Sequence, residues 1–542
     1  MKVLGAMIAE KCSSKLWNPI KASQGGMAFS HLFFADDLVL FARADRKNCV
    51  AVREVLDSFC DLSGQKVSQE KSRVFFSPNV SADSRSDLCN FLGFRSTPML
   101  GKYLGFLIKH PGTPHDFGFI LGRVQGRLAG WKANLLSFAG RLVLTQAVTT
   151  TIPNYAMQCS ALPAKITSNL DRLSRNFFWG SSDNKKKLHL VGWSKVTRPK
   201  KEGGLGIQAA RAKNIALLAK LNWRLATEPN SLWAKVLTQK YRTPRRLLNP
   251  RIPFRTCSVT WSAIQKGELI FKKGSKWIVG RDSCLSLCYD KWLDKGELRS
   301  LIEGPLSRGE EHIQLKNVVS FSGWDWQGCT FNLPKQLLLE VKATPISFSA
   351  QNLDQITWSS NPSGNFELKE AYKLARMEEM GKPSCRFNGE WIWKVQTIPK
   401  ILCFIWQCYF NSIPVRSVLA SRGMEVPVSC LLCDKGLESV LHVLRDCCVA
   451  HEFWNSFPPP FLAAVFYETQ LVDWLRLNCG SMKNYVAANL NWGIVFSFGI
   501  WTLWLRQNGV VFRGVRPNRN VREEVISKAT EFAYVGINGK RT

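Results

Sequence analysis

The stretch SHLFFADDLVLFARAD, residues 30–45, places two adjacent aspartates, Asp36 and Asp37, between two short apolar runs. Runs rich in Phe, Leu and Val on both sides of a tight polar connection predict a β-hairpin. An Asp-Asp pair in a surface turn is most often merely solvated. The flanking strands favour a rigidly held turn, however, and two carboxylates held side by side suit a divalent metal ion such as Mg²⁺.

Helices and further strands are expected on the C-terminal side of this hairpin. Residues 48–62 carry apolar side chains at helical spacing, and Gly64 ends the pattern. Residues 74–76 and 100–108 are strand-like. From about residue 117 to 241, Leu, Ala, Val and Trp recur at intervals of three and four, which predicts a mainly helical region.

The charge of the chain indicates a polyanionic partner. Its 542 residues include 73 Lys and Arg against 41 Asp and Glu, a formal net charge of +32. Nucleic acid is the most common partner of so basic a protein, and an anionic membrane surface comes next. The 45% hydrophobic content and 20 Trp exclude disorder as the main state, and the length suggests three or four domains.

Basic residues concentrate between residues 182 and 256, in runs at 185–187, 195–201 and 242–255. The functional interpretation is a surface that follows phosphates. The alternatives are a solvated surface or a nuclear-import signal. The set as a whole favours phosphate contact. The nearby GGLGI segment, residues 203–207, lacks the arrangement of a phosphate-binding loop and is predicted to be a turn.

A second informative stretch is CLLCDKGLESVLHVLRDCCVAHEFW, residues 430–454. Its spacing, Cys430-x₂-Cys433-x₈-His442-x₄-Cys447, supplies three thiolates and one imidazole, which suit tetrahedral Zn²⁺ in a closed structural site. The alternative to a zinc site is that these four residues are unrelated buried side chains, because the chain contains cysteines at other positions as well. Two further residues are alternative ligands: Cys448 in place of Cys447 and, with less support, His451.

The N-terminal residues, the cysteines and the longest uncharged stretch indicate the cellular compartment. The first residues show no signal-peptide pattern, so a nuclear or cytoplasmic location is expected rather than secretion. The chain has 17 cysteines, and in such a reducing compartment clustered cysteines should bind metal rather than form disulfides. The uncharged stretch 485–505 has a dense apolar part of only 14 residues, which favours a buried helix and no membrane span.

Together with SGQKVSQEKS (63–72), the segment 30–45 resembles the later palm motifs of a reverse transcriptase. The similarity is to plant non-LTR, LINE-type retrotransposons, where Phe-Ala-Asp-Asp is a common acidic motif. The resemblance implies that Asp36 ligates Mg²⁺, that Asp37 assists, and that Lys71 lies near the incoming nucleotide as a proton donor to pyrophosphate. An ordinary exposed lysine is the alternative for Lys71. Residues 103–105 resemble the primer-grip strand.

The resemblance extends over nearly the whole chain. Segments 162–180 and 191–207 fit it, and segments 358–372, 390–414 and 430–454 resemble the zinc-binding domain downstream of reverse transcriptase in these elements, which is thought to contact nucleic acid. The helical spacing of Trp391, Trp393 and Trp406 favours core packing over base stacking. The expected architecture is α+β and multidomain: a truncated palm (1–110), a helical, basic, thumb-like region (111–245), a mixed Trp-rich connector (246–385), a zinc-binding domain (386–480) and a helical tail (481–542).

One catalytic element is missing from the sequence. A polymerase of this kind needs a further palm carboxylate from a strand well upstream of the aspartate pair, yet the 35 residues before Asp36 contain Glu10 as their single acid. No motif of the fingers subdomain of a polymerase or of a ribonuclease H domain is expected in this sequence either. The expected function is therefore a reverse transcriptase fragment that binds RNA and DNA as primer and template, contains structural Zn²⁺, and does not polymerise by itself. The alternative is a zinc-dependent nucleic-acid-binding protein without catalysis.

Overall fold

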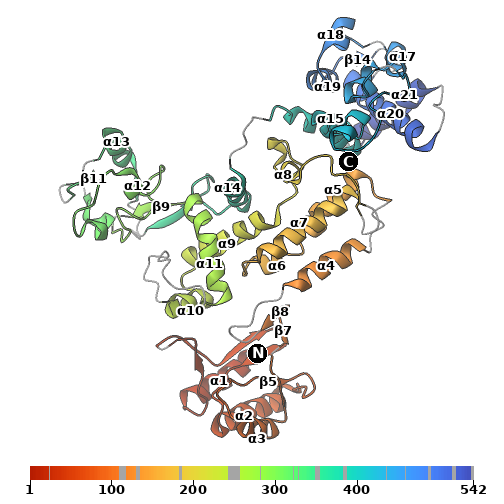
Figure 1. Ribbon diagram of the computed structural model, residues 1–542. Coiled ribbons are helices and arrows are strands. Elements are labelled where there is room, and N and C mark those ends of the chain that lie inside the picture. The colour runs from red at the N-terminus through yellow and green to blue at the C-terminus, as the bar shows by residue number, and fades with distance from the viewer. Residues whose placement is uncertain are drawn as a thin grey trace. The chain divides into compact units, whose positions relative to one another are not determined.

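The computed structural model describes most of the chain as two compact units that alternate along the sequence (Figure 1). Unit 1 comprises residues 1–117, 155–162 and 214–378, and unit 2 comprises 118–154, 163–213 and 379–542. The part of the chain that the structure describes omits residues 24, 100, 109–116, 130–134, 182–185, 242–256, 281, 321–322, 327–328, 332, 348–353, 382–386, 435, 458, 486–489, 515–519 and 539–542. The basic run at 242–255 and Lys185 of the run at 185–187 thus lie outside the described residues.

The N-terminal part of unit 1 contains the predicted acidic hairpin. Strands β3 (His31–Phe34) and β4 (Asp37–Leu40) pair antiparallel, with Phe34 opposite Asp37, so Ala35 and Asp36 form the turn. Ala35 adopts a φ of 52°, as tight two-residue hairpin turns require. The prediction of a hairpin at residues 30–45 is confirmed.

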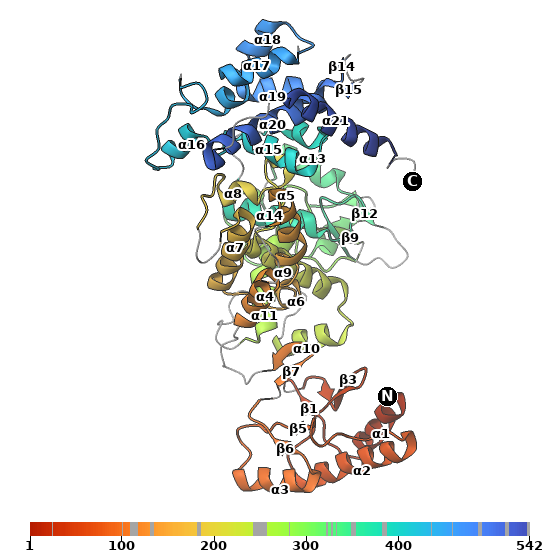
Figure 2. The same cartoon turned by 90° about the vertical axis from the view of Figure 1, so that its right-hand side faces the viewer.

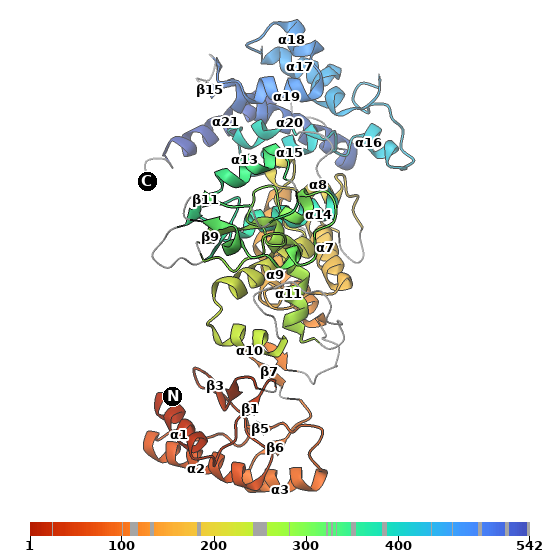
Figure 3. The same cartoon turned by 90° about the vertical axis from the view of Figure 1, so that its left-hand side faces the viewer.

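Helices pack beside this hairpin (Figure 3). The predicted helix 48–62 is α2 (Arg46–Ser63), which begins where the Asp45 side chain accepts a hydrogen bond from the Asn48 amide and ends at Gly64 with a φ of 70°. Its buried face meets α1 (Lys2–Ser13) in a small core, made of Leu4, Ile8, Trp17, Ala51, Val52, Val55 and Leu56.

Short strands complete this part of unit 1. The strand expected at 74–76 is β5 (Arg73–Val74), which pairs parallel with β6 (Arg95–Ser96) after helix α3 (Ala82–Leu92). The strand or hairpin expected at 100–108 is a hairpin of β7 (Gly101–Tyr103) and β8 (Phe106–Ile108), turned at Leu104 and Gly105, both with positive φ. The short β1 (Ile20–Lys21) and β2 (Ala28–Phe29) form another antiparallel pair.

The remainder of unit 1 mixes helices with a small sheet. Strand β9 (Ser275–Gly280) lies between β12 (Ile346–Ser347), parallel to it, and β13 (Gln355–Trp358), antiparallel. A core beside β9 is built around the fully buried Trp292. The other elements here are α6 (Asn154–Met157), α9 (Ala210–Thr227), α10 (Leu232–Tyr241), α11 (Val259–Gly274), α12 (Leu298–Leu301), η5 (Glu310–His312), η6 (Leu315–Asn317), β10 (Val319–Ser320), β11 (Gly323–Trp324), α13 (Lys335–Ala343) and α14 (Leu368–Met380).

Unit 2 is mainly helical, and its C-terminal helices gather around α20 (Figure 2). Helix α20 (Trp492–Arg513) lies against α19 (Leu471–Cys479) and α21 (Val521–Asn538). No helix in the described part of the chain is long and apolar enough to cross a membrane. The other elements are α4 (Gly118–Ala129), α5 (Phe138–Leu144), η2 (Thr145–Thr149), α7 (Ala164–Trp179), α8 (Trp193–Val196), η3 (Lys200–Glu202), η7 (Glu390–Lys394), α15 (Pro399–Tyr409), α16 (Arg416–Ser421), η8 (His442–Asp446), α17 (Cys448–Ser456), α18 (Ala463–Glu468), β14 (Asn484–Tyr485) and β15 (Leu490–Asn491).

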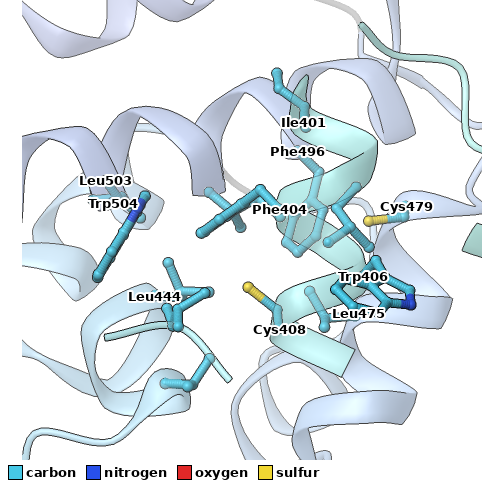
Figure 4. Close-up of a cluster of buried hydrophobic side chains, with 14 of the residues drawn as sticks. Ile401, Phe404, Trp406, Cys408, Leu444, Leu475, Cys479, Phe496, Leu503 and Trp504 are labelled. Carbon is cyan, nitrogen blue, oxygen red and sulfur yellow. The ribbon is translucent and has the colours of Figure 1, made fainter. Parts of the chain in front are cut away.

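One hydrophobic core runs through unit 2 and includes residues from 139–207 as well as from 392–529. Helix α15 contributes Phe404, Trp406 and Cys408, and α20 contributes Phe496 and Trp504 (Figure 4). Trp406 is fully buried, and its indole N–H donates to the Gly203 carbonyl oxygen at 2.9 Å. The prediction that Trp406 packs in the core is therefore confirmed, as is the turn at 203–207, where Gly203 has a φ of 86°.

Candidate metal centre

The first two candidate zinc ligands lie on a tight turn. The Cys430 amide donates to the Gly436 carbonyl oxygen at 3.2 Å, and the Asp434 amide donates to the Cys430 carbonyl oxygen at 2.9 Å. Asp434 and Gly436 have φ values of 49° and 88°, which allow the backbone to reverse within a few residues. This turn brings the thiols of Cys430 and Cys433 close together.

The other two candidate ligands follow on a wide helical turn. Element η8 begins at His442, and the Cys447 amide donates to the His442 carbonyl oxygen at 2.8 Å, five residues back in the sequence. This is the hydrogen bond of a π-helical turn, a rare feature that is frequent at functional sites. Cys447 itself is the N-cap residue of α17, with extended backbone angles. The π-helical turn and the N-cap position that follows it bring the side chains of His442 and Cys447 together, although four residues separate them in the sequence.

The four side chains converge on one point. Their ligand atoms all lie within 4.8 Å of one another. The Cys430 and Cys447 sulfurs are 3.9 Å apart, and the Cys433 sulfur is 3.4 Å from Nε2 of His442. A tetrahedral zinc ion with Zn–S bonds of about 2.3 Å and Zn–N bonds of about 2.0 Å places its ligand atoms about 3.5–3.8 Å apart. The donor set and its spacing thus fit a zinc ion.

Burial sets the protonation states of the candidate ligands. Burial, and then the nearby Cys430 and Cys433, raise the pKa of the Cys447 thiol to about 12. Burial likewise raises the pKa of Cys430 and lowers the pKa of His442. The imidazole is thus held in its neutral, ligating form, whereas the thiols need a positive charge beside them before they ionise. A bound zinc ion would supply that charge, and Cys430, Cys433 and Cys447 would then bind it as thiolates.

The two alternative ligands lie outside this group. Cys448, the neighbour of Cys447, is exposed. The ring of His451 stacks on Tyr467 with 4.6 Å between centroids, and its Nδ1 lies 3.3 Å from the side-chain nitrogen of Asn455. Among the described residues, no other set of three or more Cys, His, Asp or Glu side chains forms a potential metal site.

Charged residues that the sequence analysis did not single out fix the surroundings of the cluster. Glu438 is buried, and its carboxylate accepts hydrogen bonds from the Arg416 amide at 3.0 Å and from Gln507 Nε2 at 2.9 Å. The buried Arg445 donates to the carbonyl oxygens of Phe466 and Thr469. Arg445 also pairs with its neighbour Asp446, but the partners named above are 21 to 69 residues away, so the local sequence does not show that these two residues are buried.

The three candidate catalytic residues at and near the acidic hairpin are exposed and do not form a cluster of this kind. Asp36 and Asp37 are both exposed at the turn between β3 and β4, and Lys71 is exposed as well. No hydrogen bond or ion pair joins these three described residues to one another. Within the described part of the chain, no third Cys, His or carboxylate joins the two aspartates in a potential metal site.

Known proteins are similar to this chain in the same region and beyond it. Residues 366–454, which include all four candidate ligands, match the family described as zinc-binding in reverse transcriptase. A "Putative ribonuclease H protein" of Arabidopsis thaliana is 34% identical over 399 residues, which cover 73% of this chain and 64% of that protein. The chain therefore spans less than two thirds of the length of this relative. An "Uncharacterized mitochondrial protein" of the same plant is 29% identical over 143 residues, 26% of this chain and 92% of that protein.

These similarities agree with the geometry of the site. The family match and the relatives support a retrotransposon-type reverse transcriptase region, and the Cys/His cluster lies inside the matched zinc-binding segment. The matched segment is therefore similar to the zinc-binding part of reverse transcriptases, and it contains a cysteine- and histidine-lined site of the zinc-binding kind.

Proposed function

We propose that the chain is the later palm, thumb-like and zinc-binding part of a LINE-type, non-LTR retrotransposon reverse transcriptase, and that it binds nucleic acid without polymerising by itself. The observation that carries this proposal is the convergence of Cys430, Cys433, His442 and Cys447 within the segment that matches the reverse transcriptase zinc-binding family. Bound zinc would supply a rigid crosslink between the tight turn and the start of α17. It would have a structural role, since all four positions of a tetrahedral ion are filled by the protein.

RNA and DNA, as primer and template, are the proposed partners. The formal charge of +32 supports a polyanionic ligand, and the name of the longer relative refers to ribonuclease H, an activity on nucleic acid. We place this activity in the nucleus or cytoplasm. The proposed parts are a palm remnant at 1–110, a thumb-like region at 111–245, a connector at 246–385, a zinc-binding domain at 386–480 and a helical tail at 481–542.

The absence of catalysis rests on the acidic hairpin. In a complete palm, Asp36 and Asp37 would share two Mg²⁺ ions with a carboxylate from another strand, and Lys71 would protonate the leaving pyrophosphate. Here the described residues place no third carboxylate beside the exposed pair. The second candidate function is zinc-dependent nucleic-acid binding without catalysis, which the converging Cys/His ligands support.

Metal analysis and nucleic-acid binding on the same protein test the zinc part of the proposal. The purified chain should contain one zinc per molecule by mass spectrometry, and it should bind a fluorescent RNA–DNA duplex. Stripping the zinc with a chelator should abolish binding, and adding zinc back should restore it. Protein purified without zinc that binds the duplex equally well would contradict the proposal.

Primer extension tests the catalytic part. The chain, Mg²⁺, nucleotides and a primed RNA template should give no extended product, with a complete retroviral reverse transcriptase as the positive control. Extension that Asp36→Asn abolishes would show a working metal site at the hairpin and would overturn the non-catalytic assignment.

A further inference from the structure

Hydrogen bonds join two distant segments of unit 2, and the later segment belongs to the zinc-binding region. The Trp406 indole N–H donates to Gly203, and the Trp393 indole N–H donates to the Lys200 carbonyl oxygen at 3.1 Å. Arg422 donates to the Leu190 carbonyl oxygen at 2.7 Å. The partners in these hydrogen bonds are 193 to 232 residues apart in the sequence. The earlier of the two segments contains one of the basic runs found in the sequence.

The contacts between the segments place lysines on aromatic rings. Lys195 Nζ lies 5.2 Å from the centre of the Phe410 ring, and Lys200 Nζ lies 5.0 Å from the centre of the Trp393 ring. Such cation–π contacts hold a flexible lysine in place while its ammonium stays accessible. The short helices η3 and η7 lie side by side, so Lys201 and Lys394 belong to the same surface. We call Lys195, Lys200, Lys201 and Lys394 the composite basic face.

The composite basic face is exposed and carries few compensating charges. All four lysines are exposed. The acids within 190–203 and 390–400 are Glu202 and Glu390, against six Lys and Arg that include Arg198 and Lys400. None of the four lysines has a described ion-pair partner. A fixed group of uncompensated ammonium ions is complementary to a row of phosphates.

The aromatic rings position the lysines rather than offering stacking platforms. Trp406 is buried, and Trp393 is tied by its N–H and has Lys200 over its ring. Reading of bases by stacking needs a free ring face. Contacts at this surface should therefore be to the backbone, without preference for sequence.

We infer that the composite basic face, assembled from residues 195–201 and 390–400, binds the phosphate backbone of nucleic acid independently of base sequence. The inference rests on the proposed function, and it assigns the proposed nucleic-acid binding to the composite basic face. It assigns the contact to a joint surface of the thumb-like region and the zinc-binding region, rather than to either region alone.

Charge-removing variants of the full-length chain test this inference. The test variant changes all four lysines of the composite basic face to Gln, which keeps most of each side chain. The matched control changes Lys272, Lys273, Lys276 and Lys295 to Gln, which removes the same formal charge from unit 1, where each lysine is paired with an acid. Binding of a 20-nucleotide single-stranded RNA and of an RNA–DNA duplex is measured from 50 to 300 mM salt, each with two unrelated sequences. Zinc content and circular dichroism confirm that both variants are folded.

The test variant should bind about tenfold or more weakly, and the slope of log K against log salt should become shallower by about 0.7–0.9 for each phosphate that the protein no longer neutralises. The control should bind as the unaltered chain does, and the two sequences should bind alike. Comparison of the two ligands shows whether single strands or duplexes are held. Equal weakening of both variants, or a test variant that binds like the unaltered chain, would overturn the inference while leaving nucleic-acid binding intact. Failure of the unaltered chain to bind either ligand would instead refute the proposed function.

Discussion

At the scale of single residues, we expect the proposed metal centre to depend on each of its four ligands. We predict that Cys433→Ser loses zinc and lowers the melting temperature of the chain. Structural zinc contributes about 10–16 kcal/mol of binding free energy in zinc-finger peptides, which is comparable to the stability of an ordinary domain, about 5–15 kcal/mol. Cys448→Ser is the matched control, because Cys448 is exposed and lies outside the cluster. Zinc content and thermal unfolding are measured together, and full zinc occupancy in Cys433→Ser would contradict the assignment.

Lys213 provides a residue-scale prediction about pH. It is only 6% exposed, its Nζ donates to the Thr150 carbonyl oxygen at 2.7 Å, and burial lowers its pKa to about 8 from 10.5. Between these two pH values the unfolded chain binds more protons than the folded chain at this residue, so this group makes stability rise with pH. The rise should approach about 1.4 kcal/mol per pH unit at most. Lys213→Met should lack it.

Urea unfolding at pH 7, 8 and 9 measures this effect as the difference between the unaltered chain and the variant. Buried thiols such as Cys403 and Cys479, with their pKa raised to about 12, lower stability at alkaline pH in both proteins, so their effect cancels in the difference. Lys220→Met, an exposed position on the same helix, serves as the control. A difference that stays constant from pH 7 to 9 would show that Lys213 does not titrate in this range.

At the scale of elements, the 190–207 segment is held by a close backbone approach. A Cβ atom on Gly204 would overlap the carbonyl oxygen of Arg198, which accepts the Gly206 amide. Gly204→Ala should therefore open the turn that carries Gly203 and its bond to Trp406, at a cost of about 1–3 kcal/mol. Gly192→Ala is the control, because it lies in the same segment with a φ of −59° and an added Cβ would meet nothing closer than 3.8 Å. Denaturant unfolding compares the two, and equal stability would mean that the turn is not needed.

The elements also differ in how far local sequence patterns determine them. The β3–β4 hairpin, helix α2 with its cap at Asp45 and its end at Gly64, and the core position of Trp406 follow from local patterns, because periodicity and capping act over a few residues. The convergence of the four candidate ligands between Cys430 and Cys447 is local too, because it depends on the tight turn after Cys430 and on the π-helical turn that begins at His442. The contacts that join these elements are long-range. Trp406 donates a hydrogen bond to Gly203, 203 residues away, and Gln507 donates one to Glu438, 69 residues away. Periodicity shows that a side chain is buried without showing which partner covers it.

At the scale of the whole molecule, a large core of unit 2 includes two of the four proposed metal ligands. Cys430 and Cys447 belong to the same cluster of buried residues as Phe404 of α15 and Phe496 of α20. Removal of the metal would leave buried thiols without their crosslink at the centre of a core that reaches from residue 139 to residue 529. The zinc site should therefore stabilise all of unit 2, including the segments before residue 207, rather than the neighbourhood of the cysteines alone.

Hydrogen exchange with and without zinc tests this coupling. Chelation should remove the protection of α7, α15 and α20 together, although α7 is more than 250 residues from the first ligand in the sequence. Unit 1 is the internal control: among its described residues no potential metal site is found, so the sheet of β9, β12 and β13 should keep its protection. Restoring zinc should restore α7, α15 and α20 in parallel. Loss of protection confined to residues 430–456, with α7 and α20 unchanged, would show that the zinc-binding segment unfolds separately and that the shared core does not couple it to the remainder of unit 2.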